Sequence, residues 1–201
     1  MIVRPYAPGD DAALYDICLR TGDNGGDASH LYADPRVLGE IFVGPYLRFE
    51  PSLAFVVDDG AVAGYVLGAR DTTEFSKSCE REWWPPLRER YPREAFPDGT
   101  PDARCVALIH EPRRADPSVV DEYPAHLHID MLPRVQGHGM GRALMERLLT
   151  ALHDAGAPGV HLGVGAANTR AIGFYERMGF ATLETSDRGR LMARRTGAAA
   201  G

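Results

Sequence analysis

The stretch with the clearest capacity for chemistry is a glycine-rich turn, residues 136–141 (QGHGMG). It follows a β-like run, residues 126–131, and precedes apolar residues at helical spacing, so we expect it to join a strand to a helix. The first amides of a helix lack acceptors and lie at the positive end of its dipole, where phosphate binds. Because Gly137, Gly139 and Gly141 carry no side chains, a pyrophosphate can approach these amides closely.

Two familiar phosphate-binding motifs do not fit this turn. No Gly-Lys-Ser/Thr follows it, as a Walker A motif requires, and its glycine spacing differs from the dinucleotide fingerprint. Nucleotide hydrolysis is therefore disfavoured. Taken alone, the motif also fits a strand-to-helix turn that binds no ligand.

Three titratable residues, His126, His128 and Asp130, precede the turn. Strand residues two apart share a face, so these side chains are predicted to lie together, as a proton relay or a metal site. Metal is the weaker interpretation, because His-x-His lacks the further ligands that such a site needs. Asp130 is the candidate acidic catalytic or substrate-orienting residue. Alternatives are that it only orders the loop, or that Glu111 or Glu122 serves instead.

The rest of the pattern predicts the elements that position these residues. Alternating or β-rich runs indicate strands, and apolar residues at helical spacing between caps and glycines indicate helices. The predicted strands are residues 2–6, 53–57, 62–67, 126–131 and 160–164, with a terminal hairpin from residue 180 that turns at 187–189. The first two predicted helices begin after Asp10 and at Asp34-Pro35, and residues 21–33 form a loop between them. A third begins at residue 74 and is interrupted at Pro85-Pro86. The last two begin at Met140, with an end at Gly156, and at Thr169, after the cap Asn168.

Composition bounds the class of protein. Hydrophobic residues make up 44% and charged residues 25% of the 201 residues, as in ordinary globular domains. A net charge of −6 without a long basic cluster argues against nucleic acid as a partner. No apolar run approaches the roughly 20 residues that span a bilayer, and the N-terminus lacks a secretory pattern, so we expect a cytoplasmic protein without a membrane partner. Cys18, Cys79 and Cys105 are expected to be reduced thiols.

Two segments together resemble one enzyme family. Gln136, Gly139 and Gly141 fill the Gln/Arg-x-x-Gly-x-Gly/Ala signature of the GCN5-related N-acetyltransferases (GNAT). Residues 168–180 (NTRAIGFYERMGF) are similar to the family's Asn-x-x-Ala-x-x-Phe-Tyr-x-x-x-Gly-Phe segment. The resemblance covers about residues 125–185. It implies an α/β (α+β) fold with a mixed, mostly antiparallel sheet and helices on both faces.

The resemblance also implies a reaction and its residues. Acetyl would pass directly from the thioester of acetyl-CoA to an amine, with no metal. The Met131 amide would stabilise the oxyanion, Tyr175 would protonate the departing thiolate, and Asp130 joins Tyr175 as the second catalytic candidate. A core aromatic is the alternative for Tyr175. The implied cofactor-binding residues are Met131, Leu132, Gln136, Gly137, His138, Gly139, Met140, Gly141, Arg142 and Asn168.

A second resemblance concerns the middle of the chain. Residues 77–85 (KSCEREWWP) and 2–6 (IVRPY) are similar to the acetyltransferase-like C-terminal domain of animal O-GlcNAcase, so we expect a free-standing bacterial relative of that domain. The expected organisation is a single domain, residues 1–196, with an insertion at about 74–124 and a flexible tail, 197–201.

Several alternatives stay open. The expected acceptor is a small-molecule amine, a protein lysine or a protein N-terminus, and a homodimer is open. One rival function is an acetyl-CoA-binding module with little or no catalysis, because the O-GlcNAcase domain is thought to be a degenerate transferase. Another is a protein-interaction module that uses Trp83 and Trp84 as an exposed apolar anchor.

Overall fold

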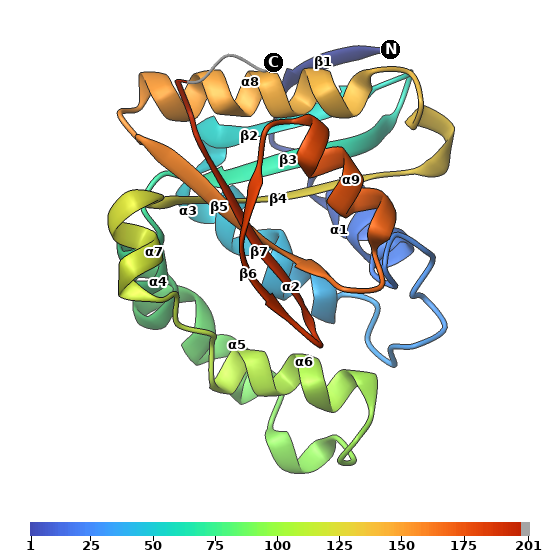
Figure 1. Ribbon diagram of the computed structural model, residues 1–201. Helices are drawn as coiled ribbons and strands as arrows, with labels where there is room; N and C mark the ends of the chain where they lie inside the picture. Colours follow the sequence, from blue (N-terminus) through green and yellow to red (C-terminus); the bar gives the residue numbers. More distant parts are fainter. Residues whose placement is uncertain (198–201) are drawn as a thin grey trace.

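The computed structural model describes residues 1–197, so the predicted flexible tail lies outside the described residues from residue 198 onward. Within that range one seven-stranded sheet has the order β1-β2-β3-β4-β5-β7-β6 (Figure 1). All neighbouring strands are antiparallel except β4 and β5, which confirms the predicted mixed sheet. The strands are β1 (Ile2–Pro5), β2 (Ala54–Asp58), β3 (Val62–Ala69), β4 (Ala125–Met131), β5 (Gly159–Gly165), β6 (Ala181–Ser186) and β7 (Gly189–Arg195).

Helices cover both faces of this sheet (Figure 1). Helix α1 packs on β3 and β4, and α8 packs on β1, β2 and β3. No helix within residues 1–197 has both the length and the apolar character needed to cross a membrane. The helices are α1 (Asp11–Thr21), α2 (Val37–Phe42), α3 (Gly44–Phe49), α4 (Thr72–Ser78), α5 (Trp84–Arg90), α6 (Pro101–His110), α7 (Pro117–Glu122), α8 (Met140–Asp154) and α9 (Thr169–Arg177), with short helical turns at Pro51–Leu53, Cys79–Trp83, Arg93–Ala95 and Pro133–Val135.

Alternation along the strands divides the core between the two faces. In β3, Tyr65 and Leu67 join the cluster under α1, while Val66 joins the cluster under α8 and α9. Gly68 brings α8 close to the sheet, because a Cβ there would lie 2.6 Å from Leu148 Cδ1. The period-two pattern therefore decides which face each polar residue of the neighbouring strand β4 occupies.

Residues 70–124 connect the neighbouring strands β3 and β4, and their ends meet. The backbone N–H and the hydroxyl of Thr72 both donate to the Pro124 carbonyl oxygen, at 2.8 and 2.7 Å. Helices α5 and α6 in this connection contribute buried Leu87 and Ile109 to the α1 side of the core. The connection thus packs on the same side of the sheet as α1.

The predicted interruption at Pro85-Pro86 is wrong. A π-helical turn, Cys79–Trp83, joins α4 to α5, and the prolines occupy the first turn of α5. A first-turn residue needs no intrahelical acceptor for its amide, so proline is tolerated there. The Trp84 amide donates to the Cys79 carbonyl, which keeps the helical path continuous.

Two predicted helix starts differ from the structure in detail. Asp10 precedes α1, but its carboxylate binds Arg4 at 2.7 Å and accepts from the Ala7 amide, so it does not cap the helix. Helix α2 begins at Val37 rather than at Asp34-Pro35, because Asp34 Oδ1 accepts from the Arg36 amide and forms a turn first. In both cases the aspartate bonds to a nearby amide outside the helix.

Candidate active site

The glycine-rich turn has a backbone that requires glycine at two positions. Gly137 and Gly139 have φ angles of 79° and 76°, and Gly139 directly precedes α8. Residues with a Cβ rarely adopt such angles. A Cβ at either glycine would meet nothing within 4 Å, so the backbone here borders open space.

The amides of this turn are unused. Among residues 1–197, none of the amides of residues 137–142 donates a hydrogen bond, and the first bond into α8 runs from the Ala143 amide to the Gly139 carbonyl, at 3.0 Å. Helix α8 is 15 residues long and has no acidic residue in its first turn. A run of free amides at the N-terminus of a long helix is an anion-binding site.

Two contacts hold the turn against the end of β4. Gln136 Nε2 donates to the Met131 carbonyl oxygen at 2.7 Å. A Cβ at Gly141 would lie 3.1 Å from Met131 Cε and 3.4 Å from Phe174 Cε2, so the glycine lets α8 approach both the strand and α9. Gln136 and Gly141 therefore fix the free amides close to Met131.

Strands β4 and β5 separate beside this turn. Their parallel pairing comprises Ala125 with Val160 and His126 with His161, at the start of β4. The Leu132 amide donates to the Ala63 carbonyl of β3, and backbone groups alternate sides along an antiparallel strand. The Met131 amide consequently faces the unpaired side toward β5, the position expected for an oxyanion donor.

Asp130 lies on the α1 face of β4 at the edge of this separation. Its Oδ2 accepts from the Tyr65 hydroxyl at 2.8 Å, and its side chain is 20% exposed. Burial raises the pKa of Asp130 to about 7, while the hydrogen bond from Tyr65 partly opposes that rise. A carboxylate with a pKa near 7 is suited to accept and release a proton at neutral pH.

His128 lies next to this carboxylate. Its Nδ1 is 3.1 Å from the Phe42 carbonyl oxygen, which assigns the ring proton to Nδ1, and its Nε2 is 3.4 Å from Asp130 Oδ2. Burial lowers the pKa of His128 to about 4, so the ring is neutral. The bare Nε2 of His128 faces the Asp130 carboxyl group, and the relay between them stays a prediction.

His126 lies on the same face of β4 as His128 and Asp130, but its hydrogen bond is to a different element. Its Nδ1 is 2.8 Å from the Thr72 hydroxyl, and its ring packs against Tyr46 and Phe75. Burial lowers its pKa to about 3. His126 is thus a neutral residue at the junction of the 70–124 connection.

The other acidic candidates are engaged elsewhere. Glu111 forms an exposed ion pair with Arg93 at 2.8 Å, and Glu122 forms one with Arg195 at 3.0 Å. Neither contacts Asp130. Within residues 1–197, no three His, Cys, Asp or Glu side chains are grouped to hold a metal ion.

Tyr175 lies on α9, on the other face of the sheet. Its ring packs against Phe174 and Phe180, with centroids at 5.5 and 5.7 Å. Its hydroxyl makes no hydrogen bond within residues 1–197, yet it is not sealed from solvent. Burial and then the charge of Asp130 raise the pKa of Tyr175, so the phenol is protonated and able to donate.

The remaining predicted site residues surround the turn. Asn168 Oδ1 caps α9 by accepting from the Ala171 amide at 3.1 Å, so one predicted role, ordering the nearby backbone, is present. Leu132 is buried in the core cluster on the α1 side of the sheet. Arg142 pairs with Glu146 along α8 at 3.2 Å. His138 and Met140 contribute backbone amides to the free set.

Sequence reasoning missed one partner of Asp130. Tyr65 pairs directly with Asp130 across β3 and β4. The alternation of residues 62–67 places Tyr65 on a definite face, but only the strand register brings it to Asp130.

The tryptophans do not form an exposed anchor. Trp84 is 7% exposed, and the Trp83 indole donates to the Glu40 carbonyl oxygen at 2.8 Å. Both rings pin the 70–124 connection to the core. The interaction-module alternative built on these two residues is therefore wrong.

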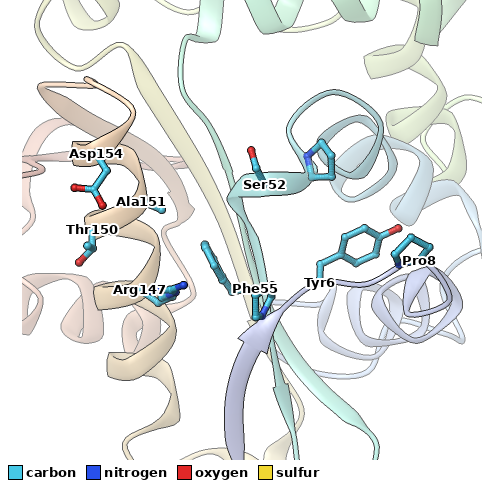
Figure 2. Close-up of a pocket in the computed structure, with 10 residues that line it drawn as sticks. Tyr6, Pro8, Ser52, Phe55, Arg147, Thr150, Ala151 and Asp154 are labelled. Atoms are coloured by element: carbon cyan, nitrogen blue, oxygen red, sulfur yellow. The ribbon is translucent and has the colours of Figure 1, made fainter.

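A separate surface pocket of about 500 Å³ lies between β1, β2 and α8 (Figure 2). Tyr6, Phe55 and Arg147 line it, with the Arg147 guanidinium 5.2 Å from the Phe55 ring centre. None of the predicted site residues lines this pocket. It is distinct from the site at the β4–β5 separation.

The sheet opens between its parallel strands, with free helix-terminal amides on one side and acid–base groups nearby, an arrangement that suits the transfer of an acyl group. The sequence matches the acetyltransferase (GNAT) family over residues 27–180. The chain belongs to this family, and the predicted resemblance is confirmed.

Three proteins are similar to the chain over different shares of its length. The crystal structure of SsHAT is 46% identical, covers 98% of both chains and has a TM-score of 0.92. Protein O-GlcNAcase of Rattus norvegicus is 28% identical over 88% of this chain, which spans about a fifth (20%) of that relative's length. Peptidyl-lysine N-acetyltransferase YjaB of Salmonella typhimurium is 41% identical over 30% of this chain and 40% of its own.

The fold also matches a structure with a bound cofactor. The structure of yncA from Salmonella typhimurium with its cofactor acetyl-CoA covers 100% of this chain and 96% of its own, with a TM-score of 0.57 and 14% identity. This likeness concerns the fold.

Proposed function

We propose that the chain is an acetyl-CoA-dependent N-acetyltransferase that moves acetyl directly from the thioester to an amine. The observation that carries the proposal is the run of free amides at residues 137–142 beside Met131 and Asp130. Membership of the acetyltransferase family supports it, as does the acetyl-CoA bound to yncA. The acceptor class includes lysine side chains, since YjaB is a peptidyl-lysine N-acetyltransferase.

The residues present fit acetyl-CoA. Its pyrophosphate matches the free amides, because the positive-φ glycines border open space and the first turn of α8 has no acidic side chain to repel an anion. When bound, acetyl-CoA supplies an activated acetyl group. The residues that would hold it are Met131, Leu132, Gln136, Gly137, His138, Gly139, Met140, Gly141, Arg142 and Asn168.

The chain's own groups divide the proton transfers between the two faces of the sheet. Asp130 accepts the proton of the attacking amine, with the Tyr65 hydroxyl orienting its carboxylate. The Met131 amide stabilises charge that develops on the acyl oxygen. Tyr175 donates its phenolic proton toward the leaving sulfur. The separation of β4 and β5 lets groups on opposite faces act at one point.

Direct transfer is favoured over an acyl-enzyme, because the cysteines are poor nucleophiles. Cys18, Cys79 and Cys105 are free and buried, and burial raises the pKa of each thiol. The thiolate form is therefore scarce at neutral pH.

The test is amine-dependent release of the CoA thiol, followed with a thiol reagent and matched by mass spectrometry of the acetylated amine. We expect one thiol per acetylated amine, and an unchanged chain mass when acetyl-CoA is added without amine. Binding of acetyl-CoA without turnover across small amines, lysine peptides and free N-termini would instead identify the non-catalytic module.

Replacing Tyr175 by Phe removes one hydroxyl and leaves the packed ring in place. We expect kcat to fall about 10²-fold, the lower end of general acid catalysis, because a thiolate is a fair leaving group at neutral pH. Acetyl-CoA affinity and the unfolding midpoint, measured on the same sample, should stay at wild-type values. Unchanged turnover under conditions where chemistry limits the rate would make Tyr175 a core aromatic only.

A further inference from the structure

The sheet face that carries Asp130 is covered on only one side of the β4–β5 separation. Over β3, helices α1, α2 and α3 bury this face. Gly163 of β5 is exposed, and so is every residue of the outer strand β6. An open half-sheet therefore begins directly next to the catalytic carboxylate.

The strand register shows which residues form the surface of this open half-sheet. His126 and His161 pair across β4 and β5 with ring centres 5.9 Å apart, so they share the Asp130 face. Two residues beyond His161, Gly163 lies on the same face. Gly163 pairs with Leu191 of β7, which in turn pairs with Glu184 of β6.

A pocket of about 390 Å³ lies at the far end of this surface, between α7 and the β6–β7 hairpin. Leu183 and Leu191 give it an apolar base, and Leu183 is 44% exposed. Its carboxylates are Asp116, Glu122 and Glu184. Glu122 is neutralised by Arg195, whereas Glu184 has no ion-pair partner within residues 1–197.

We propose that this open face and its pocket bind the acceptor, an extended lysine peptide whose arginine or second lysine reaches Glu184 while an adjacent apolar side chain packs on Leu183 and Leu191. The acceptor lysine enters over Gly163, where a Cβ would meet nothing within 4 Å. This inference rests on the proposed acetyl transfer. It adds which residues of the acceptor peptide are recognised near the lysine.

The dimensions favour a peptide over a small amine. The two strand spacings from β5 across β7 to β6 amount to about 10 Å, and the separation of β4 from β5 adds more than one further spacing. Four extended residues span about 13 Å, and the lysine and arginine side chains extend that reach at both ends. A small amine held at Asp130 would not touch the pocket. A peptide with a cationic residue four positions from the lysine reaches both.

The experiment compares kcat/KM for three acceptors in wild type, Glu184→Lys and Glu89→Lys. The acceptors are an alanine-based peptide with one lysine and an arginine four residues away, the same peptide with glutamate for arginine, and a small primary amine. We expect wild type to prefer the arginine peptide over the glutamate peptide about 10-fold. Glu184→Lys should reverse that preference, leaving the small amine and acetyl-CoA affinity unchanged.

Glu89→Lys is the matched control, since Glu89 is an exposed carboxylate on α5, outside the pocket, and the change in charge is the same. It should behave as wild type. Equal use of both peptides by wild type, or a preference that Glu184→Lys leaves intact, would overturn the acceptor surface while acetyl transfer to the small amine still stood. If no acceptor, the small amine included, were acetylated, the proposed function would fail together with this inference.

Discussion

Gly139→Asp is expected to abolish acetyl-CoA binding, and with it all measurable transfer. The side chain would project from the run of free amides at 137–142 and place a negative charge where the pyrophosphate must lie. The backbone φ of 76° would also be strained by any Cβ. Thermal shift gives the readout: wild type should gain stability with rising acetyl-CoA, and the variant should gain none.

Gly99→Asp separates charge at the site from backbone strain. Gly99 has a φ of 81°, and a Cβ there would meet nothing within 4 Å, so the local cost matches that at Gly139. It lies in the 70–124 connection, away from the amides. We expect this control to retain the full ligand-induced shift; a full shift in Gly139→Asp as well would remove the turn from the binding site.

Asp130→Asn is expected to lower kcat/KM about 10³-fold, within the range for loss of a general base. The amide keeps the size of the carboxyl group and still accepts from the Tyr65 hydroxyl, but it cannot take up the amine proton. The unfolding midpoint and acetyl-CoA affinity should change little. A loss of kcat/KM under tenfold would mean that Asp130 only orders the loop.

The pH profile distinguishes a base from a structural carboxylate. Because the pKa of Asp130 is raised to about 7, the active, deprotonated form is scarce below that pH. With an arylamine acceptor, whose own titration lies well below this range, wild-type kcat/KM should rise tenfold per pH unit up to about 7 and then level off. Asp130→Asn should have a flat profile, and a persistent inflection would point to another group.

Local motifs made half of the candidate site predictable. The strand, the glycines of 136–141 and the helix that follows are contiguous, so their spacing alone indicates free amides at a helix N-terminus. Asn168 is a second such case. Its predicted capping of α9 is confirmed, because its side chain accepts from the amide of Ala171, three residues later. Such features depend on neighbours in sequence.

Contacts across the fold were not predictable in this way. Tyr65 and Asp130 are 65 residues apart and meet only through the register of β3 and β4. Pro85-Pro86 looked like a break, because the sequence carries no sign of the preceding π-helical turn. His126 and His128 look equivalent in sequence, yet one bonds to Thr72 and the other approaches Asp130.

Calorimetric titration of the full chain with acetyl-CoA tests the central claim most directly, because every proposed role depends on the cofactor lying on the free amides of 137–142. The account predicts saturable binding at one site per chain, lost in Gly139→Asp and retained in Gly99→Asp. Absence of binding to the wild-type chain, or equal binding by both variants, would contradict it.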